Sequence, residues 1–469
     1  MRVPKYKKSF GRFIFVRVAR PQTDWRSGIF AWTLLAATIL FASLPWASAV
    51  QLFAGVGKED ITPAPGLPHW KGNKPYDGVL SAINVRVLVL SDGTRKAAII
   101  QWDLEDAREG AVAKVREIVS AETGIAPRSI LVNASHTHSG PMSPLSGERM
   151  VKEDRELTAP SQQDPHYQIW ARKLFEACKR AATTANGSLQ PVTLEIGRAA
   201  VAEWLYNRRP RLPNGKAQVT LVPEDPNILP NGARFGPIDP TLTVITFRSP
   251  AKEALVTLFN FPCHAVSIYG ERASISADWP GMAAEQIESR VGGRAIFLQG
   301  CAGDLVPTRR GIEAAREMAE KIGERAANAA KRGLRLEIDR LFVDASTVEL
   351  PLSSEHRADV EREFNRSEVQ VFVLGSLAIV ALPGEPMIEL AMTIQKRSPY
   401  PHTVVLGYSN GTGVFYVGMP GEKARGGLGG DRWNHGTDEC GVVLVESAVR
   451  LLNESLAPPK PEPRKETGR

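Results

Sequence analysis

The sequence predicts an α/β fold, with a mixed β-sheet core flanked by helices in a single large domain. Strand-like apolar runs alternate along the chain with stretches of helical spacing, which is typical of a sheet covered by helices. Some neighbouring runs are joined by short turns, which adds antiparallel pairs to the sheet. The chain has 469 residues, but no internal repeat and no second clear core indicates another domain.

In the first half of the chain, the expected strands are short runs that end at turn residues. Residues 91–94 (Ser-Asp-Gly-Thr) predict a hairpin turn, and Gly124 is the expected end of the first helix. Residues 142–165 are polar and contain Pro, so we expect a mobile loop there. The expected strands lie within residues 55–63, 79–90, 97–102, 130–133 and 191–198, and the expected helices cover residues 111–121 and 166–185.

The second half continues this alternation. Residues 207–240 are rich in Pro, Asn and Gly, and a long irregular segment of this kind in a compact domain is often a lid or a substrate loop. Residues 407–430 predict a second, Gly-rich loop. The expected strands cover residues 241–247, 255–261, 295–298, 404–406 and two apolar runs within 369–382, and the expected helices cover residues 279–291, 312–331 and 442–452.

Both ends of the chain are expected to lie outside the folded domain, which we place at residues 50–456. Residues 1–49 are typical of a signal peptide or an N-terminal anchor, because a basic region precedes an apolar run and an Ala-Ser-Ala cleavage pattern. We therefore expect an exported protein, periplasmic or secreted, with membrane anchoring by the apolar segment as the alternative. Residues 457–469 are rich in Pro and charge, and we expect them to be disordered.

Charge and cysteine content exclude two broad classes. Eight of the 58 Lys and Arg residues but only one of the 51 acidic residues fall within residues 1–49, so the rest of the chain is neutral. Without a basic stripe, nothing indicates a nucleic-acid partner. The four cysteines are too few and too widely spaced for a disulfide-framework fold, and they leave any pairing open.

The most informative motif is a His-x-His loop directly after an apolar run. The run at residues 130–132 leads to His136 and His138, which alternation along a strand would place on one side, and Gly140-Pro141 then predicts a turn. Neutral imidazole is the commonest protein ligand of zinc. The alternative interpretation is a polar strand end with two solvated or hydrogen-bonded histidines.

The same arrangement recurs along the chain. Other apolar runs lead to His264, Asp304, Glu385 and, in the Gly-rich loop, toward Tyr416. In α/β sheets, ligands gather at the carboxyl ends of strands, and two histidines with a carboxylate form a known catalytic zinc shell. Taken singly, each residue has a structural alternative: a satisfied core histidine, a turn aspartate, a helix N-terminal acid and a packed aromatic, respectively.

These landmarks resemble the neutral (non-lysosomal) ceramidases, in the same order along the chain, over most of residues 52–455. The closest match is the loop Asn133-Ala-Ser-His-Thr-His-Ser-Gly-Pro141. The other matching segments are Gly55-Val-Gly-Lys-Glu-Asp-Ile-Thr62, Phe261-Pro-Cys-His264 with Ser276-Ala-Asp278, Gln299-Gly-Cys-Ala-Gly-Asp304 and Leu382-Pro-Gly-Glu385.

The resemblance implies a zinc site and its ligands. It makes His136, His264, Glu385 and a tyrosine the metal ligands, with His138 as a catalytic partner beside the metal. The tyrosine is assigned to Tyr416 through a one-residue insertion in the Gly-rich loop, with Tyr408 as the alternative. Asp304, in the Gly-Asp loop, is the second expected catalytic residue, and either it or Asp278 is expected to orient a ligand histidine.

The sequence departs from the family pattern in two places. Val306 stands where the ceramidases have a serine that serves in amide cleavage, and valine has no hydroxyl group. The chain also ends soon after its last expected helix, so we expect no counterpart of the family's C-terminal immunoglobulin-like domain. The substrate is therefore less closely specified than the metal site.

The resemblance predicts a zinc-dependent amidohydrolase that cleaves a linear N-acyl amide, such as N-acylsphingosine or a related N-acyl lipid, with water activated by the metal. The expected partner is a small-molecule or lipid substrate, with contact to a membrane surface. Two alternatives stay open. One is a zinc hydrolase of another ester or amide, and the other is a non-catalytic binding protein that retains the fold.

Overall fold

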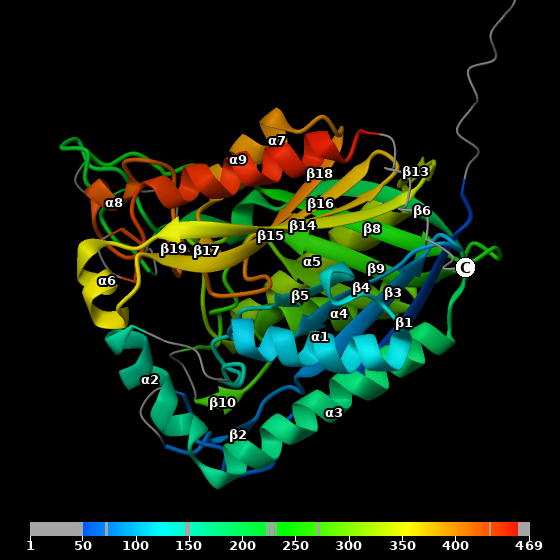
Figure 1. Cartoon of the computed structure of the whole chain (residues 1–469), viewed down its shortest axis with the longest axis horizontal. Coiled ribbons are helices and arrows are strands. Elements are labelled where there is room, and N and C mark those ends of the chain that lie inside the picture. The colour runs from blue at the N-terminus through cyan, green and yellow to red at the C-terminus, as the bar shows by residue number, and fades with distance from the viewer. Residues whose placement is uncertain are drawn as a thin grey trace, which may run out of the picture. The chain divides into compact units, whose positions relative to one another are not determined.

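The computed structural model describes residues 50–70, 74–145, 151–221, 225, 229, 232–269, 273–430 and 433–457 (Figure 1). The expected signal peptide or anchor (residues 1–49) and nearly all of the expected disordered tail (residues 457–469) lie outside the described residues. Both remain predictions.

The predicted localisation needs a correction. Across the described ranges, no helix is long and apolar enough to cross a bilayer, so the expected localisation finds no support there. The apolar segment behind that prediction belongs to residues 1–49, and we do not retain the assignment to an exported location.

A large mixed sheet forms the centre of the domain. Its strand order is β11-β9-β8-β6-β1-β3-β4-β5, and β13 also pairs with β6. The pairs β11/β9 and β4/β5 are parallel and the others are antiparallel. The strands are β1 (Leu52–Asp60), β3 (Asn84–Ser91), β4 (Lys96–Trp102), β5 (Ile130–Ala134), β6 (Gln190–Ala200), β8 (Thr241–Arg248), β9 (Ala254–Phe261), β11 (Arg294–Gln299) and β13 (Leu334–Leu336).

A second, four-stranded sheet packs on the first. The sequence had predicted a single mixed sheet and did not indicate this division. Its order is β14-β15-β16-β18, with β16 and β18 parallel. Its strands are β14 (Leu341–Pro351), β15 (Phe364–Leu374), β16 (Leu377–Ala381) and β18 (His402–Leu406). One apolar cluster joins the facing sides of the two sheets, with residues such as Leu88 and Leu131 from the first and Phe372 and Ile379 from the second.

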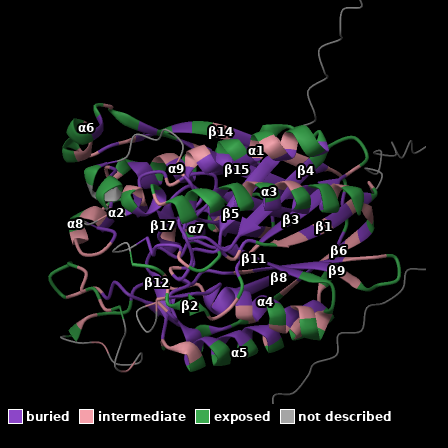
Figure 2. Ribbon diagram, turned by 90° about the horizontal axis from the view of Figure 1, so that it is seen from below, coloured by how far each residue is buried: buried purple, intermediate pink, exposed green. Residues whose placement is uncertain are grey.

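Helices cover the outer face of each sheet, so the domain has four layers (Figures 1 and 2). On the large sheet lie α1 (Glu109–Thr123), α3 (Pro165–Gly187), α4 (Asp278–Val291) and α5 (Ile312–Lys331), and on the small sheet lie α7 (Ile388–Arg397) and α9 (Glu439–Glu454). Strand alternation supplies both interfaces, because Val87 and Val89 face the helices while Leu88 and Leu90 face the other sheet. The predicted α/β class, a mixed sheet flanked by helices, is confirmed.

Some elements were missed because their sequence pattern is weak. Residues 142–165 were expected to be a loop, but α2 (Lys152–Gln162) lies there as a polar helix that contains Pro160. The sequence also gave no expectation of β14, α6 (Ser354–Val360) or α7. The remaining short elements are β2 (Gly78–Val79), β7 (Leu205–Asn207), β10 (Ser274–Ile275), β12 (Leu305–Pro307), β17 (Glu385–Pro386), β19 (Tyr416–Val417), α8 (Glu422–Arg425) and two 3₁₀ turns at Pro127–Ser129 and Ala202–Trp204. All four cysteines are buried and unpaired.

The Gly-x-Gly pair of β1 lets helix α3 approach the sheet directly. A Cβ atom on Gly55 would lie 2.0 Å from the carbonyl oxygen of Ala185, and one on Gly57 would lie 2.1 Å from that of Ala181. The two glycines share a strand face and the two alanines share a helix face. The absence of side chains therefore sets the spacing between α3 and the large sheet.

We expect Gly57→Ala to lower the free energy of unfolding by about 2–3 kcal/mol, because backbone atoms would have to move to admit the methyl group. The matched control is Gly187→Ala at the end of the same helix, where an added Cβ meets no atom within 4 Å. The control should be neutral or stabilising by up to about 1 kcal/mol. Urea denaturation measures the free energy of unfolding of both variants. Equal values for Gly57→Ala and Gly187→Ala would contradict this account of the packing.

Candidate metal centre

Loops at the ends of strands from both sheets deliver the candidate ligands to one place. His136 and His138 follow β5, His264 follows β9, and Glu385 follows β16. The two histidines of the His-x-His loop lie beyond the end of β5, and His136 has a left-handed backbone with φ of 61°. The sequence had suggested that strand alternation places the two histidines on one side. Their convergence comes instead from this loop conformation.

The side chains of these residues meet around the carboxylate of Glu385. The Glu385 Oε2 atom lies 3.3 Å from His136 Nε2 and 3.2 Å from His264 Nε2. His138 Nε2 lies 3.1 Å from His136 Nε2. His136, His264 and Glu385 are all buried. Residues from opposite sheets thus present nitrogen and oxygen atoms to a common point.

The backbone fixes which ring nitrogen each histidine presents. His136 Nδ1 lies 2.6 Å from the carbonyl oxygen of Glu105, and His264 Nδ1 lies 2.6 Å from that of Ala302. A carbonyl oxygen only accepts, so each Nδ1 carries the proton and donates it. In the neutral rings, both Nε2 lone pairs then face an ionised carboxylate oxygen. Acceptors this close repel one another unless a cation lies between them, so the donor set fits a metal ion.

The electrostatics of the site favour a neutral His264 and an ionised Glu385. Burial and the charge of Arg208 lower the pKa of His264 to about 3. Burial opposes ionisation of Glu385, but His136 and His264 hold its pKa well below the usual value. Burial also opposes protonation of His136, but Glu385 outweighs it and raises the pKa of this ring.

His138 lies at the boundary between the metal-binding groups and an open cleft. Burial and the two neighbouring imidazoles hold its pKa well below the usual value, so the ring is a neutral base. Its Nδ1 atom has no hydrogen-bond partner among the described residues. The rings of Trp70 and Tyr269 flank it at centroid distances of 5.9 and 5.1 Å. His138 is thus placed to exchange a proton with a molecule in the cleft.

Two tyrosines stand near the cluster in different ways. Tyr416 is the strand partner of Glu385 in the short β17/β19 pair, and its hydroxyl accepts a hydrogen bond of 2.9 Å from Arg208. The same Arg208 nitrogen lies 3.3 Å from His264 Nε2, which places the Tyr416 hydroxyl beside the cluster. The Tyr408 ring lies 4.2 Å from that of His136, and its buried hydroxyl has no partner among the described residues.

The two aspartates lie around the site and not in it. The Asp304 carboxylate accepts bonds from the Ile388 backbone N–H at the start of α7 and from the Asn207 side chain, and burial raises its pKa to about 6. It holds the loop whose Ala302 carbonyl orients His264. Asp278 accepts from the backbone N–H groups of Ser267, Ile268 and Trp279. Among the described residues neither carboxylate bonds a ligand histidine, so the expected direct orientation of a histidine by Asp304 or Asp278 is not found, and the catalytic role of Asp304 stays a prediction.

Sequence reasoning missed two charged residues of the site. Glu105 follows β4 and lies close enough to His136 and Glu385 to share an ion with them. Burial and the charge of Asp106 raise its pKa to about 8. Arg208 comes from the loop that we expected to contact substrate. Glu105 had a usable signal, because it too follows an apolar strand, whereas Arg208 had only its place in that loop.

A buried amide ties the loops of the site together. Asn133, at the end of β5, accepts a bond from the Gln299 N–H and donates to the Gly407 carbonyl and to Ser409 Oγ. Gln299 in turn donates from its side chain to the carbonyls of Ser135 and Cys263. The ends of β5, β9, β11 and β18 are therefore joined by side-chain hydrogen bonds, and the ligand loops start from these points.

We expect Asn133→Ala to lower the free energy of unfolding by about 1–3 kcal/mol, because it removes the acceptor of the buried Gln299 N–H, whereas the Gly407 carbonyl still accepts from Ser409 Oγ. The control is Asn186→Ala on the surface, which loses one exposed bond to Lys96 and should change stability by less than about 0.5 kcal/mol. Thermal and urea denaturation provide the measurement. A loss for Asn133→Ala no larger than that of the control would show that the amide does not hold the loops.

An open cleft of about 380 Å³ adjoins the cluster. Glu385, His138 and Tyr416 lie in its wall, and the rest of the lining is largely apolar and aromatic, with two arginines. The other lining residues are Trp70, Glu105, Met142, Arg208, Leu221, Val266, Tyr269, Arg310, Phe415, Leu428 and Trp433. The cleft can accept a molecule with an apolar part and place a polar bond near the candidate ligands.

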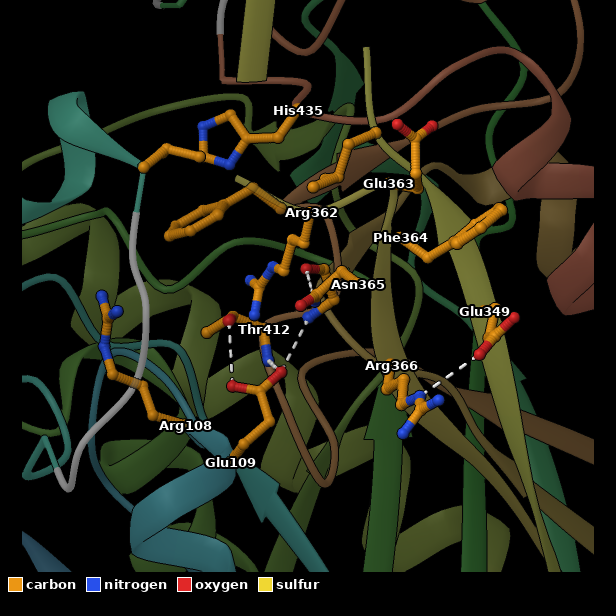
Figure 3. Close-up of a pocket in the computed structure, with 14 residues that line it drawn as sticks. Arg108, Glu109, Glu349, Arg362, Glu363, Phe364, Asn365, Arg366, Thr412 and His435 are labelled. Atoms are coloured by element: carbon orange, nitrogen blue, oxygen red, sulfur yellow. Dashed lines mark hydrogen bonds and ion pairs between the residues drawn. The ribbon is translucent and has the colours of Figure 1, made fainter. Parts of the chain in front are cut away.

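Another cavity, of about 480 Å³, lies beside Phe415 and contains none of the candidate ligands (Figure 3). Its charged groups bond within the protein. Glu109 accepts hydrogen bonds from the Thr412 hydroxyl and from the Thr412 backbone N–H, and Arg366 pairs with Glu349 at 3.2 Å. We therefore place the chemistry in the cleft beside Glu385.

Comparison with known proteins identifies the fold. The family model described as "Neutral/alkaline non-lysosomal ceramidase, N-terminal" matches residues 53–327. Among solved structures, the neutral ceramidase from Pseudomonas aeruginosa is similar with a TM-score of 0.65 and 18% identity, over 86% of this chain and 75% of that one. A structure described as ceramidase complexed with C2 is similar with a TM-score of 0.67 and 19% identity, over 86% and 76%. No curated protein matches the sequence.

Proposed function

Because the chain belongs to the neutral/alkaline non-lysosomal ceramidase family, we propose that it is a zinc-dependent hydrolase of linear N-acyl amides. The observation that carries this proposal is the meeting of His136, His264 and Glu385, with both Nδ1 protons donated to carbonyl oxygens and both Nε2 atoms directed at one carboxylate oxygen. Two histidines and a carboxylate that meet at one point are of the kind that binds zinc in catalytic sites, which supports the proposal.

In this proposal His136, His264, Glu385 and Tyr416 hold the metal. We prefer Tyr416 to Tyr408 because its hydroxyl shares an Arg208 nitrogen with His264 and because it is the strand partner of Glu385. When bound, zinc polarises a carbonyl group and lowers the pKa of water to about 7. Glu105 lies close enough to His136 and Glu385 to bond a polar group of substrate or water there.

His138 supplies the proton transfer. Its low pKa keeps the ring neutral, so it can take a proton from the attacking water and pass it to the leaving amine. Its Nδ1 atom has no partner among the described residues, and its Nε2 atom lies beside His136. Arg208, held by the Gly303 carbonyl and the Tyr416 hydroxyl, fixes a positive charge beside the reacting group, where it favours a developing oxyanion.

The apolar walls of the cleft favour an acyl chain as part of the substrate. Trp70, Met142, Val266 and Leu428 line it, and the ceramidase complexed with C2 is a structural neighbour. We propose an N-acyl lipid, N-acylsphingosine or a related compound, as the substrate. A zinc hydrolase of another amide or ester is the second candidate, and the observation in its favour is the valine at the family's serine position.

We expect the purified protein to bind about one zinc per chain and to release fatty acid from a long-chain N-acyl amide. His136→Ala should lose both metal and hydrolysis, because it removes a ligand from a shell of four. His166→Ala, an exposed histidine at the start of α3, is the matched control and should keep both. Elemental analysis and a panel of acyl amides and acyl esters give the readout.

Three results of this panel would alter the proposal. Metal retained by His136→Ala would contradict the site. Cleavage of esters alone would favour the second candidate. Zinc binding without hydrolysis of any panel member would favour a binding protein that retains the fold.

We expect a serine at position 306 to confer no gain in activity. Val306 is fully buried against Tyr206 and Val266 and pairs with Tyr206 between β12 and β7. Val306→Ser and Val306→Ala should each lower the free energy of unfolding by about 1–3 kcal/mol through lost packing. They should have equal rates on a long-chain N-acyl amide. A higher rate for the serine variant than for the alanine variant would mean that the hydroxyl takes part in cleavage and that valine marks a changed substrate.

A further inference from the structure

Two arginines line the cleft beside the candidate ligands, and they differ in how they are held. Arg208 is buried and donates to the Gly303 carbonyl and the Tyr416 hydroxyl. Arg310 is partly buried and donates one hydrogen bond of 3.0 Å, to the Leu221 carbonyl. Of the two, Arg310 has the larger share of its guanidinium group left unbonded.

Arg310 also differs from the other arginines of the neighbouring loops. Arg309 pairs with Glu317 at 2.5 Å, Arg209 with Glu422 at 3.3 Å, and Arg211 with Glu389 at 2.9 Å. Among the described residues, no carboxylate lies within 4.0 Å of the Arg310 guanidinium group. Arg310 therefore forms no ion pair with any of them. The cleft wall contains two carboxylates, those of Glu105 and Glu385, and both lie close to the ring of His136.

Among the described residues, no carboxylate forms an ion pair with Arg310, whose positive charge lies in a partly desolvated place. Burial and the like charge of Arg208 lower the pKa of Arg310, and the charge of Asp278 only partly opposes them. Asp278 itself is occupied by three backbone N–H groups. A guanidinium group that faces a cleft without a carboxylate partner among the described residues is costly, and an anion beside it relieves that cost.

We propose that Arg310 binds an oxyanion on the substrate, so that the enzyme prefers N-acyl amides that carry a carboxylate or a similar group to neutral ceramide-like amides. The planar guanidinium fork matches a carboxylate, and the adjoining apolar wall accepts the acyl chain. The inference deepens the proposed function and rests on it for the bond that is cleaved, but the anion site itself is a property of the chain.

The test measures binding by the full chain freed of metal, so that a carboxylate cannot bind zinc instead. Three probes are compared by isothermal titration calorimetry, with eleven alkyl carbons on the amide group in each: N-dodecanoylglycine, with its carboxylate on the amine side, N-undecylsuccinamic acid, with its carboxylate on the acyl side, and neutral N-dodecanoylethanolamine. We expect at least one carboxylate probe to bind about tenfold or more tightly than the neutral one. The tighter of the two identifies the side that faces Arg310.

The preference should disappear in Arg310→Gln and persist in Arg309→Gln, which removes the same charge from the adjacent, exposed residue. If Arg310→Gln does not fold, Arg310→Met, which keeps the aliphatic stem, takes its place. Equal binding of all three probes by the wild-type chain, or an unchanged preference after loss of Arg310, would overturn the inference.

Hydrolysis separates this inference from the proposed function. Zinc-loaded protein that cleaves neither anionic nor neutral amides, while the binding preference persists, would refute the proposed function and leave the anion site standing. Cleavage of neutral amides by a protein without the binding preference would refute the anion site alone.

Discussion

The buried amide of Asn133 is the interaction on which the site depends. Three hydrogen bonds from one side chain join the end of β5 to the start of the Gln299 loop and to the turn after β18. These loops belong to two different sheets, whose facing sides are joined mainly by apolar contacts. Apolar packing is tolerant of small sliding movements, whereas hydrogen bonds are directional. The amide therefore defines the relative position of the strand ends from which the ligand loops leave.

The histidine rings are oriented by the same means. Carbonyl oxygens of Glu105 and Ala302 take the Nδ1 protons and so decide which nitrogen is presented. Asp304 holds the loop that carries Ala302 by bonding the first N–H of α7. Backbone carbonyl groups thus decide which ring nitrogen each histidine presents, and a sequence does not reveal these contacts.

The regular elements and the main ligand candidates were predictable from the sequence, for physical reasons. Strands such as β4 and β5 are bounded apolar runs, and α5 has a clear apolar stripe, so local pattern sufficed. The His-x-His loop and Glu385 stood out because each follows such a run. The division into two sheets was not predictable, because strands that are apolar on both faces give the same pattern whether helices or a second sheet cover them.

Other features depend on contacts between distant parts of the chain. Arg208 lies in an irregular segment without periodicity, and its role comes only from its bonds to Gly303 and Tyr416. The His136 backbone is left-handed, and the presence of a histidine in a sequence does not predict that conformation. The polar helix α2 carries no apolar stripe to reveal it. In each case tertiary contacts, and not local preference, determine the structure.

The candidate ligand groups come from two sheets and from distant parts of the chain. This division has consequences for fragments of the protein and for its synthesis. The segment matched by the family model, residues 53–327, contains both histidine loops but neither Glu385 nor Tyr416. A fragment cut at that boundary would carry two of the four proposed ligands. During synthesis, too, the two histidines leave the ribosome before Glu385 and Tyr416, so the proposed site can form only after nearly the whole domain has been made.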